Sequence, residues 1–562
     1  MDETAGRDGL TRLKELVGKF ETGAEFSELP QNKDYPIVLV PGFSGWGPPL
    51  LGAVNYWGGV EDLPRMLQEQ GYTVIVATIA PLSSNWERAC ELYAQLVAGR
   101  FSTVNPNTGE LVEQFDLDVD YGRYFGNDPS TAAVTAQTHG RRRAILLPAA
   151  SWRDLHWTWG DQNKAHFICH SQGGNTVRQM IALLKDGAND VHPGYFPENK
   201  QGRDEWVISV STLGTPYQGT TITDVIQDLL SKSGNDTVRL LGRLFATLSF
   251  RGPAERAYDL QLDHWGICRE AGESFPDMRA RLERRGGPVE TWLASQRNAF
   301  YDNSIEGVEA LNDEAKGPSK HICYLTFSFH CTNPFPSWPP WVPAALSSFP
   351  ISIYDIIRAL LRPLPGGDIA MFAIDSIRQS LTSVILWPFF QTLVTFHDFL
   401  KWATTHVATR LLEDLDFKLK LPGPGSYVPR KDVFPLMLPT VYAMGGYDPL
   451  RNPALSASRR EIIRNNSEMW LLNDGIVNTV SMRGPRNDDI IHDVSEANPF
   501  PLAKLGGADD RKLVRGKYWH FGVTGYLDHA DEIGVWIDSD TGKNLKDMYK
   551  NLAALVSRIP PA

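Results

Sequence analysis

The chain has 562 residues, a length that allows a large core in two domains or in one α/β domain with long insertions. Its net charge of −11 at pH 7 argues against a nucleic-acid partner, because phosphate binding needs a basic face. The five cysteines are odd in number and have no metal-finger spacing, which argues against a disulfide scaffold.

The first twenty residues, MDETAGRDGLTRLKELVGKF, are charged throughout and lack the apolar core of a secretory signal. The chain is therefore expected to be either intracellular or secreted with its signal removed, and its localisation stays unknown.

Strands and helices alternate along the chain. Short, largely apolar runs are typical of strands that helices cover on both faces, and they occur at 36–40, 72–77, 165–169, 206–211 and 322–327. Helical patterns fall between them at 61–70, 86–96 and 176–185. This alternation predicts the α/β class, with a central, mostly parallel sheet flanked by helices.

The region 333–425 interrupts this pattern with an apolar, aromatic insertion. Its stretch 379–396, QSLTSVILWPFFQTLVTF, has no charge, but Pro388 and several polar residues make a membrane-spanning helix the weaker interpretation. Two alternatives stay open: a helical cap with an apolar face, able to lie on a membrane or lipid droplet, and a buried subdomain without a lipid role. We therefore expect four parts: an N-terminal extension (1–35), a core (36–332), the insertion (333–425) and the rest of the core (426–562).

A candidate nucleophile follows the third strand, where 167–174 reads FICHSQGG. A strand, a tight turn carrying Ser171 and a helix together make a nucleophile elbow, which exposes the hydroxyl at the carboxyl end of the sheet. Cys169 stands where a glycine is usual, but cysteine packs like a small apolar side chain. We expect Cys169 to be buried, unpaired and unreactive. An ordinary strand-to-helix turn is the structural alternative.

The loop after the first strand, VPGFSGWG at 40–47, lies where this arrangement places a second oxyanion donor. The backbone N–H groups of Phe43 and Gln172 are the predicted oxyanion hole.

Eight stretches occur in the same order as in one known family: PGFSGWG, NYWGG, PLSSNWERACELYAQL, HSQGG, LGTPYQGTT, LDHWG, NDGIVNTVSMRGP and DHADEIGV. They reach from about residue 36 to 536 and resemble the thermoalkalophilic bacterial true lipases of the bacillary and staphylococcal type. The resemblance implies an α/β-hydrolase fold and a serine hydrolase.

The resemblance completes a triad with Asp474 as the acid and His529 as the base, in the order Ser, Asp, His. Asp474 follows the apolar stretch 470–472 and is expected at a strand end. Competing residues stand in polar turns or within reach in sequence, and spacing alone does not exclude the two histidines: Asp448, Asp488, Asp489, His492 and His520. His170 is expected to be a packed neighbour of the nucleophile.

The resembling lipases carry zinc on two aspartates and two histidines. Here Asp263 keeps one ligand and Glu87 replaces the other carboxylate, but the histidine pair is absent, so zinc is not expected. Calcium stays a candidate, since Asp531 replaces a glutamate ligand, although Trp536 stands at another ligand position. No cofactor is expected to be required.

The segment 221–250 has apolar residues at helical spacing and corresponds to the lid of the family, with a core-facing helix as the alternative. We expect a carboxylic ester hydrolase, acting on acylglycerols or other long-chain lipid esters. The alternatives are an esterase or lactonase for a bulky apolar compound, and a non-catalytic, membrane-associated binding protein on a hydrolase scaffold.

Overall fold

The computed structural model describes residues 8–22, 29–50, 52–105, 108, 110–119, 139–154, 156–188, 196–232, 237–315, 317–335, 350–352, 418–420, 425–430, 433–434, 437–453, 455–486, 488–535 and 539–562. The stretch 379–396 and nearly all of the 333–425 insertion lie outside these ranges. Within them, no helix has the length and apolar character needed to cross a membrane.

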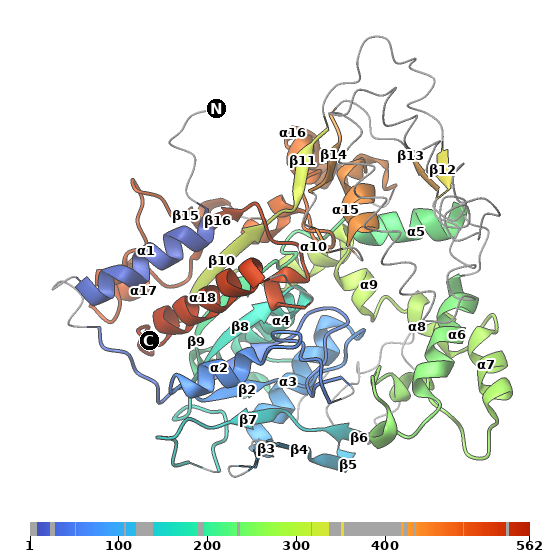
Figure 1. Ribbon diagram of the computed structural model, residues 1–562, viewed down its shortest axis with the longest axis horizontal. Helices are drawn as coiled ribbons and strands as arrows, with labels where there is room; N and C mark the ends of the chain where they lie inside the picture. Colours follow the sequence, from blue (N-terminus) through green and yellow to red (C-terminus); the bar gives the residue numbers. More distant parts are fainter. Residues whose placement is uncertain are drawn as a thin grey trace, which may run out of the picture.

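A ten-stranded sheet forms the centre, in the order β15-β16-β10-β9-β8-β1-β2-β7-β3-β4 (Figure 1). All pairs from β15 to β2 are parallel, whereas β7 runs antiparallel to β2 and β4 antiparallel to β3. The bounds are Ile491–Asp493 (β15), Tyr518–Thr524 (β16), Cys323–Phe329 (β10), Val207–Leu213 (β9), Ala165–His170 (β8), Ile37–Val40 (β1), Val74–Val76 (β2), Ile145–Leu147 (β7), Ser102–Val104 (β3) and Leu111–Val112 (β4).

Helices cover both faces of the sheet, as the apolar strands require. One face carries α1 (Gly9–Thr22), α2 (Leu63–Glu69) and α18 (Ser539–Val556), and the other carries α3 (Asn85–Ala98) and α4 (Gln172–Asp186) (Figure 1). Alternate side chains of β1 enter the two cores: Ile37 and Leu39 on one face, Val38 and Val40 on the other. The predicted α/β class is confirmed.

Nine further α-helices lie among the described residues, most of them toward the carboxyl ends of the parallel strands (Figure 1). They are α5 (Ile222–Lys232), α6 (Thr237–Ser249), α7 (Phe275–Glu283), α8 (Pro288–Ala294), α9 (Ala299–Asp302), α10 (Ile305–Glu314), α15 (Leu438–Gly445), α16 (Ala457–Asn465) and α17 (Asp510–Leu513). Three two-stranded ribbons complete the list: β5 (Phe115–Val119) with β6 (His139–Arg142), β11 (Thr332–Pro334) with β14 (Tyr427–Pro429), and β12 (Pro350–Ser352) with β13 (Lys418–Lys420).

Helix α3 shows how local sequence sets its bounds. Ser84 accepts a hydrogen bond from the amide of Glu87, whose carboxylate accepts one from the Ser84 amide in return, a capping box. Gly99, at φ 61°, ends the helix in the left-handed conformation. These signals agree with the predicted helix at 86–96 to within two residues.

Two expected parts of the chain take a definite form. Leu13 of α1 is fully buried against the core formed with β16 and α18, so the described helix of the expected N-terminal extension is packed on the hydrolase core. The segment proposed as a lid forms two helices, α5 and α6. Phe245 and other apolar residues of α6 pack against α7 and α8, while Ile222 and Val225 of α5 pack against α15.

Candidate active site

The elbow forms directly between β8 and α4. Ser171 adopts φ 54° and ψ −132°, a conformation that few residues other than glycine occupy, and α4 begins at Gln172. The Ser171 amide donates to the carbonyl of Leu213 on β9 at 2.8 Å, and its carbonyl accepts from the hydroxyl of Thr215 at 2.8 Å. The neighbouring strand therefore holds the strained backbone in place.

Strand, helix and loop meet closely around this serine. A Cβ atom at Gly173 would lie 2.5 Å from the carbonyl oxygen of Val40, and one at Gly42 would lie 2.5 Å from Cβ of Ser171. Small residues are thus required on both sides of the contact. Cys169 is fully buried behind the turn and forms no disulfide, which confirms the packing expected of it.

The amides of Phe43 and Gln172 stay the predicted oxyanion hole: Gln172 follows Ser171 directly, and Phe43 follows Gly42, whose added Cβ would lie 2.5 Å from Cβ of Ser171. Neither amide donates a hydrogen bond to any group in the described part of the chain. The Gln172 side chain is anchored on Asn85 of α3, at 3.2 Å. Arg88 of α3 donates to the carbonyls of Pro41 and Ala80, which fixes the loop that carries Phe43. Two amides that donate to no group in the described part of the chain are suited to stabilise a developing oxyanion at Ser171.

Asp474 and His529 are in direct contact. His529 Nδ1 lies 2.8 Å from Asp474 Oδ2, and the His529 amide donates to the Asp474 carbonyl at 3.0 Å. The second carboxylate oxygen of Asp474 accepts from the amides of Ile476 and Val477 at 2.8 and 2.7 Å. The expectation that Asp474 ends a strand is wrong: it lies in a loop after a short 3-10 helix, Ser467–Trp470, because amides of its own turn hold it there.

The competing histidines have other neighbours. His520 of β16 pairs with Asp493 at 2.8 Å and with the hydroxyl of Ser328 at 2.9 Å, while His492 stacks on Trp519. The His529 ring, in contrast, lies 4.4 Å from that of His170, the residue next to Ser171.

The competing aspartates stand at short helical turns, whereas the carboxylates within 4 Å of His529 Nδ1 in the described part of the chain are those of Asp474 and Glu532. Asp448 caps the turn Pro449–Arg451, and Asp488 begins the turn Asp488–Ile490 with Asp489.

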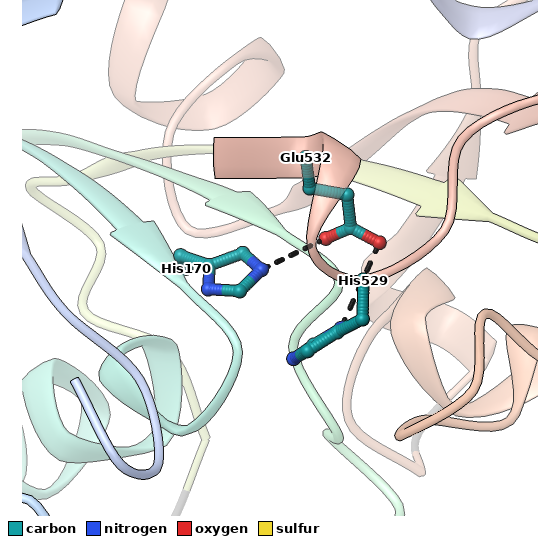
Figure 2. A group of neighbouring side chains, drawn as sticks. All are labelled: His170, His529 and Glu532. Carbon is teal, nitrogen blue, oxygen red and sulfur yellow. Dashed lines mark ion pairs between the residues drawn. The ribbon is translucent and has the colours of Figure 1, made fainter. Parts of the chain in front are cut away.

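His170 is more than the packed neighbour that the sequence suggested. Its Nδ1 lies 2.7 Å from the hydroxyl of Tyr56, and its Nε2 lies 3.2 Å from one carboxylate oxygen of Glu532. The other oxygen of Glu532 lies 3.8 Å from Nδ1 of His529, so the carboxyl group sits between the two imidazoles (Figure 2). Tyr56 and Glu532 were not predicted as site residues. Glu532 lies in a polar turn, where nothing in the sequence indicates that an acidic side chain becomes fully buried.

The pKa values around His529 reflect this crowding. Burial lowers the pKa of His529, but the charges of Asp474 and Glu532 outweigh it and raise the pKa to about 10. Burial and the charge of Asp474 raise the pKa of Glu532 well above its ordinary value. Burial and the charge of His529 lower the pKa of His170, so that ring is neutral.

The candidate zinc ligands do not fit the metal. Arg256 donates to both oxygens of Asp263 at 3.0 and 2.8 Å, and Glu87 accepts from His264 at 2.5 Å and from Trp265 at 3.0 Å. A guanidinium and an imidazole thus already occupy the carboxylate oxygens that would bind the metal. The histidine pair was expected soon after residues 120–122, and residues 120–138 lie outside the described residues.

Two other groups bear on metal binding. Asp531, the candidate calcium ligand, accepts the amide of Asp528 at 3.1 Å, while Trp536 lies outside the described residues. Within the described ranges, His170, His529 and Glu532 are the group of three potential ligands close enough to share a metal ion. A metal on His529 Nδ1 would replace the proton that Asp474 accepts, so this group fits proton handling better than metal binding.

Comparison with known proteins agrees with this geometry. Lipase 1 of Staphylococcus aureus (strain MRSA252) is 29% identical over 339 residues, which cover 57% of this chain and 42% of that protein. The lipase of Staphylococcus hyicus is 30% identical over 315 residues, covering 54% and 42%. The chain thus matches less than half the length of these curated relatives.

Solved structures share the fold. EstA from Clostridium botulinum has a TM-score of 0.56 at 24% identity, covering 97% of this chain and 91% of that one. Staphylococcus hyicus lipase has a TM-score of 0.54 at 20% identity, covering 94% and 97%. The architecture is therefore of the α/β-hydrolase type.

The family profile described as "Lipase-like, C-terminal domain" matches residues 32–107 and 130–336, half of the chain. The matched ranges contain Phe43, Ser171 and Gln172, whereas Asp474 and His529 lie beyond them. The chain therefore belongs to the lipase-like C-terminal domain family.

Proposed function

We propose that the protein is a carboxylic ester hydrolase, a lipase that cleaves acylglycerols or other long-chain esters through Ser171, His529 and Asp474. The observation that carries the proposal is the 2.8 Å contact between His529 and Asp474, with the His529 ring 4.4 Å from that of His170, the residue next to Ser171, which is held at φ 54°. The staphylococcal relatives are themselves named lipases, which supports the same substrate class.

The mechanism follows from these groups. His529 takes the proton of Ser171, and the serine oxygen attacks the ester carbonyl. The amides of Phe43 and Gln172 stabilise the oxyanion, while Asp474 stabilises the imidazolium that forms. His529 then protonates the leaving alcohol, and water releases the acyl group by the same steps.

A reaction with a fluorophosphonate tests the nucleophile. Mass spectrometry of the digested protein should find the label on Ser171, and Ser171→Ala should lose both labelling and ester turnover while keeping its melting temperature. Ser151→Ala, which changes an exposed serine, is the control and should behave like the wild type. Unchanged turnover in Ser171→Ala would exclude the mechanism.

A series of p-nitrophenyl esters and triacylglycerols, measured with and without an oil–water interface, distinguishes the substrate classes. Long-chain preference with activation at the interface supports a lipase. Activity restricted to one kind of soluble ester supports the esterase or lactonase alternative. Absence of turnover together with lipid binding supports a binding protein. The apolar 333–425 sequence favours the lipase, because an apolar surface of this kind can contact a membrane or lipid droplet.

We also propose that activity needs no zinc at Glu87 and Asp263, because His264 and Arg256 already pair with them. Dialysis against 1,10-phenanthroline should leave turnover and melting temperature unchanged. Calcium at Asp531 is tested separately with EGTA, since loss of a bound ion should lower the melting temperature.

A further inference from the structure

The loop that carries Phe43 makes a tight turn over residues 42–45. The amide of Gly45 donates to the carbonyl of Gly42 at 3.2 Å, which closes the turn. Ser44, the third residue of the turn, has φ 55°, while Phe43 before it keeps a negative φ. A negative φ followed by a positive φ is typical of a type II turn, whose third position normally holds glycine or asparagine. Serine at this position therefore carries backbone strain.

Two hydrogen bonds hold Ser44 in this conformation. Its amide donates to the carbonyl of Pro81 at 2.9 Å, and its carbonyl accepts the hydroxyl of Tyr258 at 2.9 Å. The first bond joins two backbone groups, whereas the second comes from a phenol 214 residues further along the chain. The conformation of Ser44 thus depends on the side chain of Tyr258.

Tyr258 is itself fixed by its neighbours. Arg256 and Asp259, on either side of it, pair at 2.8 Å, and Arg256 also donates to both oxygens of the buried Asp263. The Tyr258 ring is half-buried and packs edge-on against Trp46, with 6.5 Å between the ring centroids. The ion pairs hold its backbone and the indole holds its ring, so the hydroxyl is in place before a substrate binds.

The turn lies directly against the nucleophile. An added Cβ at Gly42 would lie 2.5 Å from Cβ and 3.1 Å from Oγ of Ser171. The amide of Gly42 is held by the hydroxyl of Tyr56 at 2.9 Å. A relaxation of Ser44 to a negative φ would therefore be taken up largely by Phe43, whose amide has to point at the oxyanion.

We propose that Tyr258 is a positioning residue of the oxyanion hole: its hydroxyl holds the carbonyl of Ser44 in the strained turn and so keeps the Phe43 amide directed at the oxyanion. It acts through the loop and not on the substrate. The inference rests on the proposed function, because it concerns the oxyanion that forms at Ser171.

Tyr258→Phe removes one oxygen atom from a half-buried ring and tests the inference directly. An oxyanion donor acts in the transition state and not on the bound ester, so kcat for a p-nitrophenyl ester should fall while KM stays the same. Loss of one hydrogen bond corresponds to a fall of about fivefold. The affinity for a trifluoromethyl ketone, which forms a tetrahedral oxyanion on Ser171, should fall by the same factor.

A double-mutant cycle with Ser44→Gly tests the route through the turn. Glycine adopts a positive φ without strain, and the Pro81 carbonyl still holds the amide of residue 44, so the turn no longer depends on the phenol. Tyr258→Phe should therefore lower kcat less in the Ser44→Gly background than in the wild type. An equal fall in both backgrounds would show that Tyr258 acts by another route, and would overturn the inference.

Tyr324→Phe is the matched control. The Tyr324 hydroxyl also bonds to a backbone group, the amide of Ser319 at 3.0 Å, but Tyr324 lies near the start of β10, at the end of the sheet away from Ser171. This variant should lose stability without a change in kcat or in the affinity for the ketone.

Two further results would overturn the inference: an unchanged kcat in Tyr258→Phe, or a fall that Tyr324→Phe reproduces. The second result would mean that the loss follows from lower stability and not from the oxyanion loop. Absence of both turnover and fluorophosphonate labelling in the wild type would instead exclude the proposed function.

Discussion

His529 and Asp474 are joined twice, by their side chains at 2.8 Å and by the His529 amide to the Asp474 carbonyl at 3.0 Å. Because both residues lie in loops, this double contact fixes the acid and the base relative to each other independently of the sheet. Two further amides, from Ile476 and Val477, hold the Asp474 carboxylate. The acid is thus oriented before substrate arrives, and its replacement should affect the chemistry more than the fold.

Asp474→Asn should lower kcat for p-nitrophenyl esters by roughly 10³–10⁴-fold, because the amide favours the wrong tautomer of His529. The melting temperature should change little, since asparagine keeps an oxygen for the two amides. Asp493→Asn is the matched control: it alters the His520–Asp493 pair, which has the same 2.8 Å separation. Equal losses in the two variants would point to a general effect of breaking His–Asp pairs.

The sequence reveals the parts of the site that depend on local structure. The elbow at Ser171 follows from a strand, a turn and a helix that are consecutive in the chain. The five predicted strands are β1, β2, β8, β9 and β10, and their bounds agree with the structure to within two residues. The strands β7, β3, β4 and β15 were missed because two or three residues give no periodicity, whereas the three residues of β2 lie within the longer apolar run 72–77. Strand β16, with seven residues, was also missed, and its YWHFGVT sequence mixes polar residues and glycine into an apolar run.

Residues whose role depends on distant contacts could not be found in this way. Glu532 is separated from His170 by most of the chain, and its turn, DHADEIGV, contains three other acidic or basic groups of ordinary appearance. Only the tertiary packing against Gly214 shows that this carboxyl is buried while its neighbours Asp528 and Asp531 bond to backbone amides. Asp474 and His529 were identified by resemblance, since spacing left several competitors.

Cys169 should be unreactive in the folded protein. It is fully buried, and burial raises the pKa of its thiol, which suppresses the reactive thiolate. Cys268 is the partly exposed cysteine, although burial and Asp263 raise its pKa to about 11. Native protein should therefore react slowly with Ellman's reagent at Cys268, and Cys268→Ser should remove this signal. Rapid reaction of Cys268→Ser at Cys169 would show that the elbow opens in solution.

His166 should make the fold sensitive to acid. Burial, followed by the charge of Arg515, lowers the pKa of His166 to about 3, and the ring lies 2.8 Å from the hydroxyl of Ser209. A histidine whose folded pKa is lowered favours folding fully above pH 6.5, and this contribution declines as the pH falls from 6.5 towards 3. The free energy of unfolding should therefore be about 2 kcal/mol lower at pH 5 than at pH 7 because of this histidine.

Urea unfolding at pH 7 and pH 5 measures this loss. His166→Gln should lose less stability between the two pH values than the wild type, by about the same 2 kcal/mol. His156→Gln, which replaces an exposed histidine, should retain the wild-type difference. A wild-type difference that persists in His166→Gln would assign the acid sensitivity to other groups.

Gly214→Ala should lower both the stability of the fold and the rate of phosphonate labelling, which depends on His529. The residue has φ 58°, where alanine is strained by about 1–3 kcal/mol, and the new methyl group would lie 2.2 Å from Glu532 Oε2 and 2.9 Å from its Cδ. Gly272→Ala is the matched control, because Gly272 has φ 75° but no atom within 4 Å of the added Cβ. Both variants carry backbone strain, so the additional loss of stability and phosphonate labelling in Gly214→Ala measures displacement of the carboxyl.

Combining Gly214→Ala with Glu532→Ala relieves the clash, so the double variant should be more stable than the sum of the single changes predicts. Additive effects would mean that Gly214 is needed for its backbone conformation alone.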